Sequence, residues 1–378
     1  MAQWPIICLL LGWAHESDKF DEQNDEYCYN INNMTRKISY AQAISEALVQ
    51  AMDLDPRVFI FGLGVDDFKG IFGTTLEAAK KFGSTRVFDT PASEGALTGI
   101  AIGAALNNKR PVLVHARNDF MFLALDQMLN NASKWKYVSY GHSSVPFVVR
   151  AIIGKGWGQG PVHSQSIQSV LAHFPGLYVA MPSNPYDVKG ILLKSLQVDT
   201  PAVILEHRAL YNCEGEVPAE AYTVEFGQAK IVHPGKDITV LATSLMVLEA
   251  LKAAQILKSE GIEMEIVDPV SIQPLDEETI ITSVKKTGRL ICADTSWARC
   301  GFSAEVAAMV AEKAHAHLKA AVRRIAPPPC PCPVSKPLED AFYPTYQNIL
   351  EVVYELLDRK IFSSQNRFQE VDSFVGPY

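Results

Sequence analysis

The chain has 378 residues, of which 48% are hydrophobic and 20% are charged, and its formal net charge is −8. This length and composition allow one large or two medium hydrophobic cores, and we expect two domains. Lysine and arginine are scattered rather than clustered, which argues against a nucleic-acid partner. The seven cysteines include no CxxC pair, so neither a disulfide framework nor a zinc ribbon is indicated and a cytoplasmic location is expected.

The first 34 residues differ in composition from the rest of the chain. Residues 4–14 form an apolar run that no Lys or Arg precedes and that is too short to span a membrane, and a polar, acidic segment follows it. We expect residues 1–34 to be an atypical, disordered tail, or a start codon placed too early with Met34 as the functional first residue. Residues 358–378 are expected to form a second tail, and no membrane association is expected.

Strand-like and helix-like stretches alternate from residue 35 onward. In chain order we expect a helix at 38–52, a strand at 58–63, a helix at 75–82, a strand at 86–88, a helix at 94–106, a strand at 111–115, a helix at 120–136 and a strand at 146–153. The helices are indicated by apolar residues at helical spacing and the strands by short apolar runs. This alternation is typical of the α/β fold class, a parallel sheet covered by helices.

The alternation stops at residues 214–226, which are predicted to be an extended linker between a domain at 35–213 and a second α/β domain at 227–357. In the second domain we expect a strand at 238–242, a helix at 245–259, a strand at 263–268, a helix at 279–286, a strand at 289–294 and a helix at 302–316. The proline-rich run that contains Cys330 and Cys332 is interpreted as an extended linker, with a redox or metal role as the alternative.

The stretch Asp89–Leu106 contains a single carboxylate after its first residue, Glu94, among Gly, Ala, Ile, Leu and Thr. A carboxylate in such company loses solvation, so it either meets a specific partner or keeps its proton. The residues before it are helix-start signals, so Glu94 is also expected to cap a helix. Gly95, Gly99 and Gly103 clear one stripe of this helix for close approach, by another helix more readily than by a flat ligand.

A second candidate site is the run GKGWGQGPVHSQ at residues 154–165, which follows an expected strand. Loops at the carboxyl ends of parallel strands are where open α/β sheets bind ligands. His163 is expected to open the next helix, where the helix N-terminus favours the neutral imidazole that a general base requires. The alternative is a histidine that only binds backbone groups. The glycine spacing matches neither a Walker loop nor a dinucleotide fingerprint.

In chain order, these stretches resemble the beta subunits of the thiamine-diphosphate-dependent component of 2-oxo acid dehydrogenase complexes, within the transketolase group. The resembling stretches are ISYAQAISEAL, IFGTTL, VFDTPASEGALTGIAIGAAL, DFMFLALDQMLNNASKW, GWGQGPVHSQS, HFPGLYVAMPSNPYDVKGILL, VILEHR, VDPVSIQPLD, KKTGRL and GFSAEV. The resemblance implies a parallel-sheet domain that binds the pyrimidine ring of thiamine diphosphate, followed by a smaller transketolase C-terminal-like α/β domain.

The resemblance implies roles for individual residues. Glu94 corresponds to the acid that shares a proton with the ring nitrogen remote from the amino group. Phe120 corresponds to the aromatic that stacks on the pyrimidine, although a core aromatic is the alternative. His163 matches the histidine implicated in transfer of the acyl group to a lipoyl arm, and the two residues after it would position it. Leu63 stands where the family often has an acid near the cofactor, so any contact made by that acid is lost.

The resemblance also implies partners. In the family, a GDG motif and a later Asn on the alpha subunit hold the diphosphate and its Mg²⁺, and no GDG occurs in this sequence. We therefore expect a separate alpha subunit, an α2β2 assembly that shares the cofactor and, in complexes that contain one, a lipoyl acyltransferase core. Several relatives bind potassium through an Asp and an Asn before a proline. Here Val198 and Thr200 precede Pro201, so a potassium site is doubtful, although Asp199 offers one carboxylate.

The resulting hypothesis is oxidative decarboxylation of a small 2-oxo acid, pyruvate or a branched-chain one, with acyl transfer to lipoamide. One alternative is a thiamine-dependent acyloin or ketol transferase subunit of a biosynthetic pathway. The other is a noncatalytic scaffolding relative. The presence of Glu94 and His163 argues against a scaffold, whereas Leu63 and the altered potassium loop argue weakly for one.

Overall fold

The structure, a computed structural model, describes residues 36–67, 70–155 and 158–359. The N-terminal tail, nearly all of the expected C-terminal tail, and two residues of the glycine-rich run lie outside the described residues. None of the helices described there has the length and hydropathy needed to cross a bilayer.

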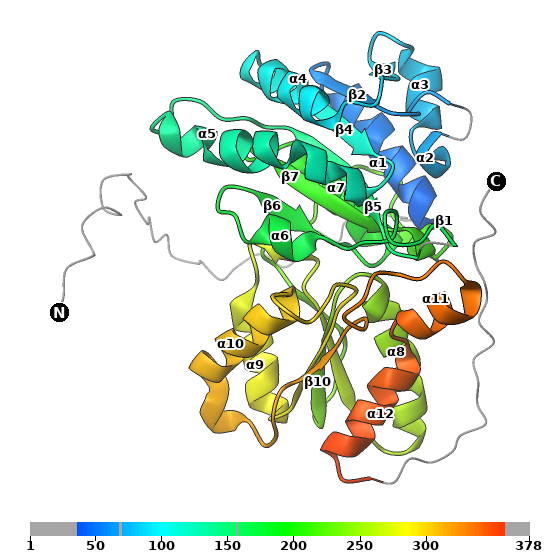
Figure 1. The fold of residues 1–378 in the computed structure, drawn as a ribbon, viewed down its shortest axis with the longest axis vertical. Helices are drawn as coiled ribbons and strands as arrows, with labels where there is room; N and C mark the ends of the chain where they lie inside the picture. Colours follow the sequence, from blue (N-terminus) through cyan, green and yellow to red (C-terminus); the bar gives the residue numbers. More distant parts are fainter. Residues whose placement is uncertain (1–35, 68–69, 156–157, 360–378) are drawn as a thin grey trace, which may run out of the picture. The chain divides into compact units, whose positions relative to one another are not determined.

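A seven-stranded sheet forms the centre of the first half, in the order β12-β6-β7-β5-β4-β2-β3 (Figure 1). Its strands are β2 (Val58–Gly62), β3 (Val87–Phe88), β4 (Arg110–His115), β5 (Val148–Ile153), β6 (Tyr178–Ala180), β7 (Ala202–His207) and β12 (Ser271–Gln273). Neighbouring strands are parallel except for β12, which runs antiparallel to β6. The α/β class predicted from the alternation is confirmed.

Helices cover both faces of this sheet. The helical segments of the first half are α1 (Tyr40–Leu54), α2 (Gly70–Gly73), α3 (Leu76–Phe82), α4 (Glu94–Leu106), η2 (Asn118–Ala124), η3 (Asp126–Ala132), α5 (Ser133–Val138), α6 (Gln168–Ala172), α7 (Pro185–Ser195) and η4 (Arg208–Leu210). The apolar residues of α1 and α7 share one core with one face of the sheet, and those of α4, η2, η3 and α6 share another. A short ribbon pairs β1 (Arg36–Ser39) with β8 (Glu214–Val217), so the expected linker begins as a strand.

The second half is built on a five-stranded sheet in the order β14-β13-β10-β11-β9. Its elements are β9 (Lys230–His233), β10 (Ile238–Ala242), α8 (Leu245–Ser259), β11 (Met264–Asp268), α9 (Glu277–Thr287), β13 (Leu290–Ala293), α10 (Phe302–Ala314), η5 (His315–His317), β14 (Arg323–Ile325), α11 (Lys336–Phe342) and α12 (Tyr346–Leu356). Helices α9 and α10 lie on one side of β10, and α8 and α12 lie on the other (Figure 1). Both halves are therefore sheets sandwiched by helices.

Local capping explains where several of these helices begin and end. Ser39 and Gln42 form a reciprocal capping box at the start of α1. The Asp276 side chain accepts a hydrogen bond from the backbone N–H of Thr279 at the start of α9, and Gly288 ends that helix in the left-handed conformation. These signals act between neighbours in the chain, so the sequence carries them directly.

The predicted helix at 120–136 is wrong in type. The segment is a 3₁₀ helix, η2, then a π-helix, η3, and only then the short α-helix α5. The physical reason lies at its start, where the side chains of Asn118 and Asp119 bind residues 165–167 instead of capping an α-helix. Long-range hydrogen bonds thus override the helical spacing of the apolar residues.

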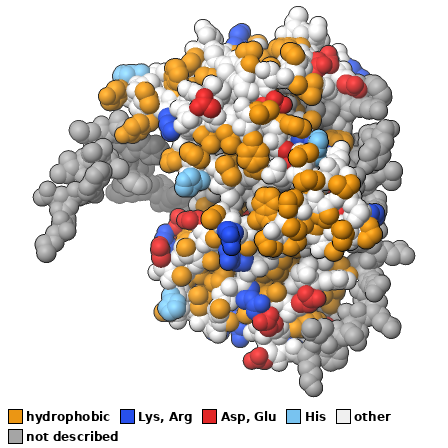
Figure 2. Space-filling model, in the orientation of Figure 1, with side chains coloured by type: hydrophobic (Ala, Val, Ile, Leu, Met, Phe, Trp, Pro, Cys, Tyr) orange, Lys and Arg blue, Asp and Glu red, His pale blue; other side chains and the backbone are white. Residues whose placement is uncertain are grey.

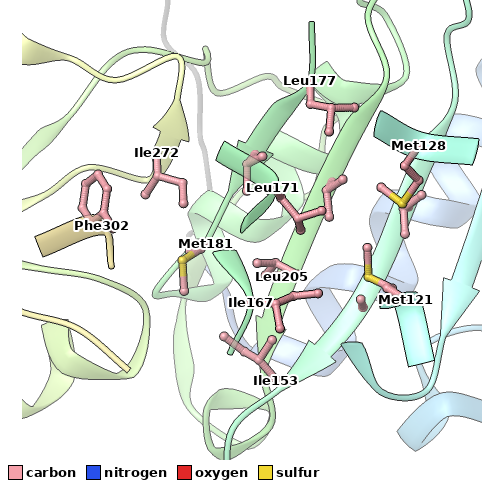
Figure 3. Close-up of a cluster of buried hydrophobic side chains, with 14 of the residues drawn as sticks. Met121, Met128, Ile153, Ile167, Leu171, Leu177, Met181, Leu205, Ile272 and Phe302 are labelled. Atoms are coloured by element: carbon pink, nitrogen blue, oxygen red, sulfur yellow. The ribbon is translucent and has the colours of Figure 1, made fainter. Parts of the chain in front are cut away.

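The larger apolar core joins both halves of the chain. Figure 3 shows its side chains between the strands and the neighbouring helices. Met121, Met128, Ile153, Ile167, Leu171 and Leu205 come from the first half, and Ile272 and Phe302 come from the second. The segments that carry Phe120 and His163 therefore pack against a core of close-packed apolar side chains.

Candidate functional site

Glu94 is the first residue of α4, as its sequence context predicts. Its side chain is only half-buried, so the expected loss of solvation is partial in this chain. Its backbone carbonyl accepts a hydrogen bond from the Thr98 hydroxyl at 2.8 Å, whereas its carboxylate accepts none from the described residues. An acid here is favoured by the helix N-terminus and still has its oxygens available to a bound group.

The glycine stripe of α4 brings η2 close to the start of this helix. A Cβ on Gly95 would lie 3.0 Å from the backbone oxygen of Leu123 in η2, and one on Gly99 would lie 3.9 Å from the Gln127 side chain. A Cβ on Gly103 would meet no atom within 4 Å. Close packing against η2, rather than a flat ligand, therefore explains why residue 95 is a glycine. The same packing places η2, which carries Phe120, beside α4, the helix that begins at Glu94.

Phe120 and His163 lie together, as a shared site requires. Their ring centroids are 5.3 Å apart with an interplanar angle of 80°, an edge-to-face contact. Phe120 is 39% exposed and is therefore not the core aromatic that was its alternative. Its neighbour Met121 is the residue that enters the core. The structure thus brings together two of the predicted site residues from segments about 40 positions apart.

The expectation that His163 opens a helix is wrong. Its backbone N–H donates to the Gly160 carbonyl at 3.3 Å within a turn, and α6 begins only at Gln168. His163 therefore does not lie at a helix N-terminus. The imidazole is half-buried, and its Nδ1 is buried without a hydrogen-bond partner in the described chain. The direction of the ring is consequently set by the backbone turn and by the contact with Phe120.

The end of this turn is held by two side chains that sequence reasoning missed. Gln165 donates through its backbone N–H (3.2 Å) and through Nε2 (2.9 Å) to Oδ1 of Asp119. Asn118 donates from Nδ2 to the Gln165 carbonyl at 2.9 Å and accepts from the Ile167 N–H at 3.1 Å. Both side chains are buried. The signal for them was a polar pair placed directly after a buried strand.

Positive charge gathers beside the glycine-rich run. Arg117 and Arg208, both buried, donate to Oε1 of Gln159 at 2.5 and 3.3 Å, and Arg208 also donates to the Lys155 carbonyl. Burial lowers the pKa of His207 to about 3, and the charges of Lys155 and Arg117 add to the effect. His207 is therefore neutral at any physiological pH and cannot add to this positive charge.

Leu63 directly follows β2, at the carboxyl end of that strand. Its side chain is 49% exposed, so Leu63 is a surface residue and not a core residue. The next N–H along the chain, that of Gly64, donates to Oδ1 of Asp89 at 2.5 Å. Asp89 thus supplies an exposed carboxylate next to Leu63, and sequence reasoning had not assigned it a contact.

The described residues do not fit a potassium ion in the loop before Pro201. Arg110 donates from Nη1 to the Val198 carbonyl and from Nη2 to Oδ1 of Asp199, both at 2.7 Å. Its side chain is only 12% exposed. A guanidinium thus already binds two oxygens of this loop, the Val198 carbonyl and Oδ1 of Asp199.

The two sandwiched sheets and the cluster at the strand ends define a transketolase-type protein. The transketolase pyrimidine-binding domain matches residues 36–214, and the transketolase C-terminal domain matches residues 227–349. Among solved structures, a split-gene transketolase described as an inactive beta4 tetramer aligns with a TM-score of 0.67 at 21% identity, covering 86% of this chain and 99% of that one. Transketolase from Leishmania mexicana aligns with a TM-score of 0.65 at 18% identity, covering 86% and 46%.

Curated relatives narrow the assignment. The beta subunit of acetoin:2,6-dichlorophenolindophenol oxidoreductase from Cupriavidus necator is 41% identical over 84% of this chain and 96% of its own length. From Bacillus subtilis, the beta subunit of the pyruvate dehydrogenase E1 component is 36% identical (85% and 99% covered) and that of 2-oxoisovalerate dehydrogenase is 37% identical (81% and 94% covered). The chain belongs to this family of E1-type oxidoreductase beta subunits.

The pyrimidine-binding domain implies thiamine diphosphate as the cofactor. The site fits an aromatic heterocycle with a basic ring nitrogen, because the Glu94 carboxylate is not engaged by other described residues and the Phe120 ring is accessible. Within the described ranges, no group of three or more His, Cys, Asp or Glu side chains is arranged to hold a metal.

Proposed function

We propose that this chain is the beta subunit of a thiamine-diphosphate-dependent dehydrogenase that decarboxylates a small 2-oxo acid and transfers the acyl group to lipoamide, a disulfide acceptor. The observation that carries the proposal is the contact of Phe120 with His163, on a segment that packs against the helix begun by Glu94. Pyruvate and branched-chain 2-oxo acids are the proposed substrates, in keeping with the names of two relatives.

The residues of this chain then have separate roles. When bound, thiamine diphosphate supplies the nucleophilic carbon and the electron sink for decarboxylation. Glu94 would share a proton with the pyrimidine nitrogen remote from the amino group, through a carboxylate at the start of α4 that accepts no hydrogen bond from the described residues. Phe120 offers its ring for stacking and orients the pyrimidine. His163 would exchange a proton with the acceptor during acyl transfer, and its Nδ1 is not engaged in a hydrogen bond with the described residues.

An alpha subunit is proposed to complete the site, in an α2β2 assembly. The sequence lacks the GDG motif, so the diphosphate and Mg²⁺ are assigned to that subunit, and the relatives are themselves named as beta subunits. Hydrophobic side chains gather at the surface in several groups (Figure 2). On α4, on η2 and from the end of α5 to Tyr140, the exposed large ones are Ile100, Phe120, Phe122, Leu123, Tyr137, Val138 and Tyr140. Such a surface suits a subunit interface. Docking to a lipoyl acyltransferase core in the cytoplasm completes the proposal.

The test is co-expression with the alpha subunit, followed by a decarboxylation assay on pyruvate and 2-oxoisovalerate and an assay of carbon–carbon bond cleavage on acetoin, which has no carboxylate to lose. Glu94→Gln should lower turnover by at least about 100-fold, because the amide cannot share a proton with the ring nitrogen. Glu77→Gln is the matched control, since Glu77 lies on α3 in an exposed ion pair with Lys80. Near-normal turnover by Glu94→Gln in an intact complex would refute the proposal.

Acetoin is a second candidate substrate. Relatives from Cupriavidus necator and Bacillus subtilis, 41% and 40% identical to this chain, are both named as acetoin oxidoreductase subunits. Glu94, Phe120 and His163 would have the same roles in the cleavage of acetoin. Preference for acetoin over both 2-oxo acids in the assay would select this candidate.

A further inference from the structure

Gly158 and Gly160 of the glycine-rich run are contacted by a segment from the far end of the chain, residues 332–343, which we call the cover segment. A Cβ on Gly160 would lie 2.7 Å from Cγ2 of Val334, so the cover segment touches the backbone of the run. Cys332 is buried with Phe342 and Tyr343, and its thiol lies 3.5 Å from the Tyr343 hydroxyl. The proline-rich run is therefore a packed structure at this end and not only a linker.

Glu339 is the charged residue of the cover segment that reaches the run. It lies on α11, is 6% exposed, and accepts a hydrogen bond through Oε2 from the backbone N–H of Gly158 at 3.2 Å. Its other oxygen, Oε1, is buried without a hydrogen-bond partner in the described residues. Burying a carboxylate with so few partners opposes folding. This unfavourable burial occurs where Glu339 of the second domain contacts Gly158 of the glycine-rich run.

The backbone N–H that Glu339 accepts, that of Gly158, lies in the chain shortly before His163. Gly158 is two residues before Gly160, whose carbonyl accepts the backbone N–H of His163. On the other side of His163, Gln165 is held by Asp119 at 2.9 Å. His163 therefore lies between two anchors, one from each half of the chain. Since no hydrogen bond holds its Nδ1, the position of the imidazole depends on these backbone anchors and on the contact with Phe120.

We propose that Glu339 is a positioning residue for His163, which it orients by holding the Gly158 N–H from the second domain. This inference rests on the proposed function of His163. It assigns to the C-terminal half an indirect part in the chemistry, through the position of His163. A displacement of the imidazole by about 1 Å is enough to lower a rate by one to two orders of magnitude.

The test uses the complete alpha–beta complex and three variants. Glu339→Ala removes the acceptor and should lower kcat about tenfold, with the cofactor affinity unchanged. Glu339→Gln keeps an oxygen for the Gly158 N–H and should restore most of the activity. Asp340→Ala is the matched control, because Asp340 is the next residue but is exposed and pairs with Lys336 at the surface.

A double-variant cycle with His163→Ala distinguishes positioning from simple support of the fold. If Glu339 acts through His163, then Glu339→Ala should cause no further loss in the His163→Ala background. A trypsin digest gives a second readout, since release of the run should speed cleavage after Lys155 in Glu339→Ala but not in Asp340→Ala. Should Glu339→Ala fail to fold, Glu339→Asp withdraws the carboxylate by one methylene and tests the same contact.

The outcomes separate this inference from the proposed function. Equal fold-losses for Glu339→Ala in the wild-type and His163→Ala backgrounds, or wild-type activity and digestion for Glu339→Ala, would overturn the positioning role alone. Unchanged turnover in His163→Ala would instead overturn the role proposed for His163, and with it the role of Glu339.

Discussion

Gly154→Ala tests how tightly the carboxyl ends of β5 and β7 are packed. A Cβ at Gly154 would lie 2.0 Å from Nε2 of His207 and within 2.5 Å of two further ring atoms. His207 is fully buried, and its Nδ1 accepts a hydrogen bond from the Ala209 N–H at 3.2 Å, so the ring cannot retreat without losing that bond. Overpacking of this kind costs about 1–3 kcal/mol.

A second cost comes from the backbone. Gly154 has φ of +78°, where a side chain adds about 1–2 kcal/mol of strain. The expected loss in the free energy of unfolding is therefore about 2–5 kcal/mol. Gly141→Ala is the control, because Gly141 has φ of +80° but a Cβ there would meet no atom within 4 Å. Gly141→Ala should lower the free energy of unfolding only by the backbone strain, about 1–2 kcal/mol.

The assay is urea unfolding of the full chain, with the midpoint compared at equal slope. The difference between the two alanine variants isolates the contact of Gly154 with His207. Adding His207→Ala to Gly154→Ala should recover part of the loss, because it removes the ring that the new methyl group meets. Equal losses for Gly154→Ala and Gly141→Ala would refute the close packing inferred for this end of the sheet.

Three further predictions concern buried and half-buried charges. Arg150→Met leaves the buried Glu206 carboxylate without its ionic partner and should lower the free energy of unfolding by about 3–5 kcal/mol in urea titration, whereas a loss below about 1 kcal/mol would contradict a tight pair. Burial raises the pKa of Asp268 to about 7. Because its unfolded value is about 4, the folded chain holds a proton that the unfolded chain releases, and stability should fall as pH rises between these values. Asp268→Asn should flatten that dependence in urea midpoints measured against pH, and an unchanged slope would exclude Asp268 as its source. Exchanging KCl for NaCl at equal ionic strength should leave Tm unchanged, because Arg110 already binds Asp199, and a potassium-specific rise in Tm would show the opposite.

The parts of the fold that depend on neighbours in the chain were predictable. The helix at 94–106, the strand at 238–242 and the helix at 245–259 were predicted with the bounds that the structure has. Apolar spacing and helix-start residues determine such elements locally. The α/β class followed from the same patterns, the transketolase family followed from the resemblance of the quoted stretches, and both are confirmed.

The candidate site was only partly predictable. Sequence and resemblance indicated Glu94, Phe120, His163 and Leu63, and the structure joins Phe120 to His163, while the roles of these residues remain predictions. The helix expected to begin at His163 is absent because the backbone there is held by Asp119 and its neighbour instead.

The sequence by itself determined most of the elements, the family and the residue types available for chemistry. Only the tertiary structure decided what holds His163, because Glu339 meets Gly158 across 181 positions of the chain. No local periodicity or spacing records such a contact. It exists because the packing of two separate sheets brings a buried carboxylate from one half to a backbone N–H of the other.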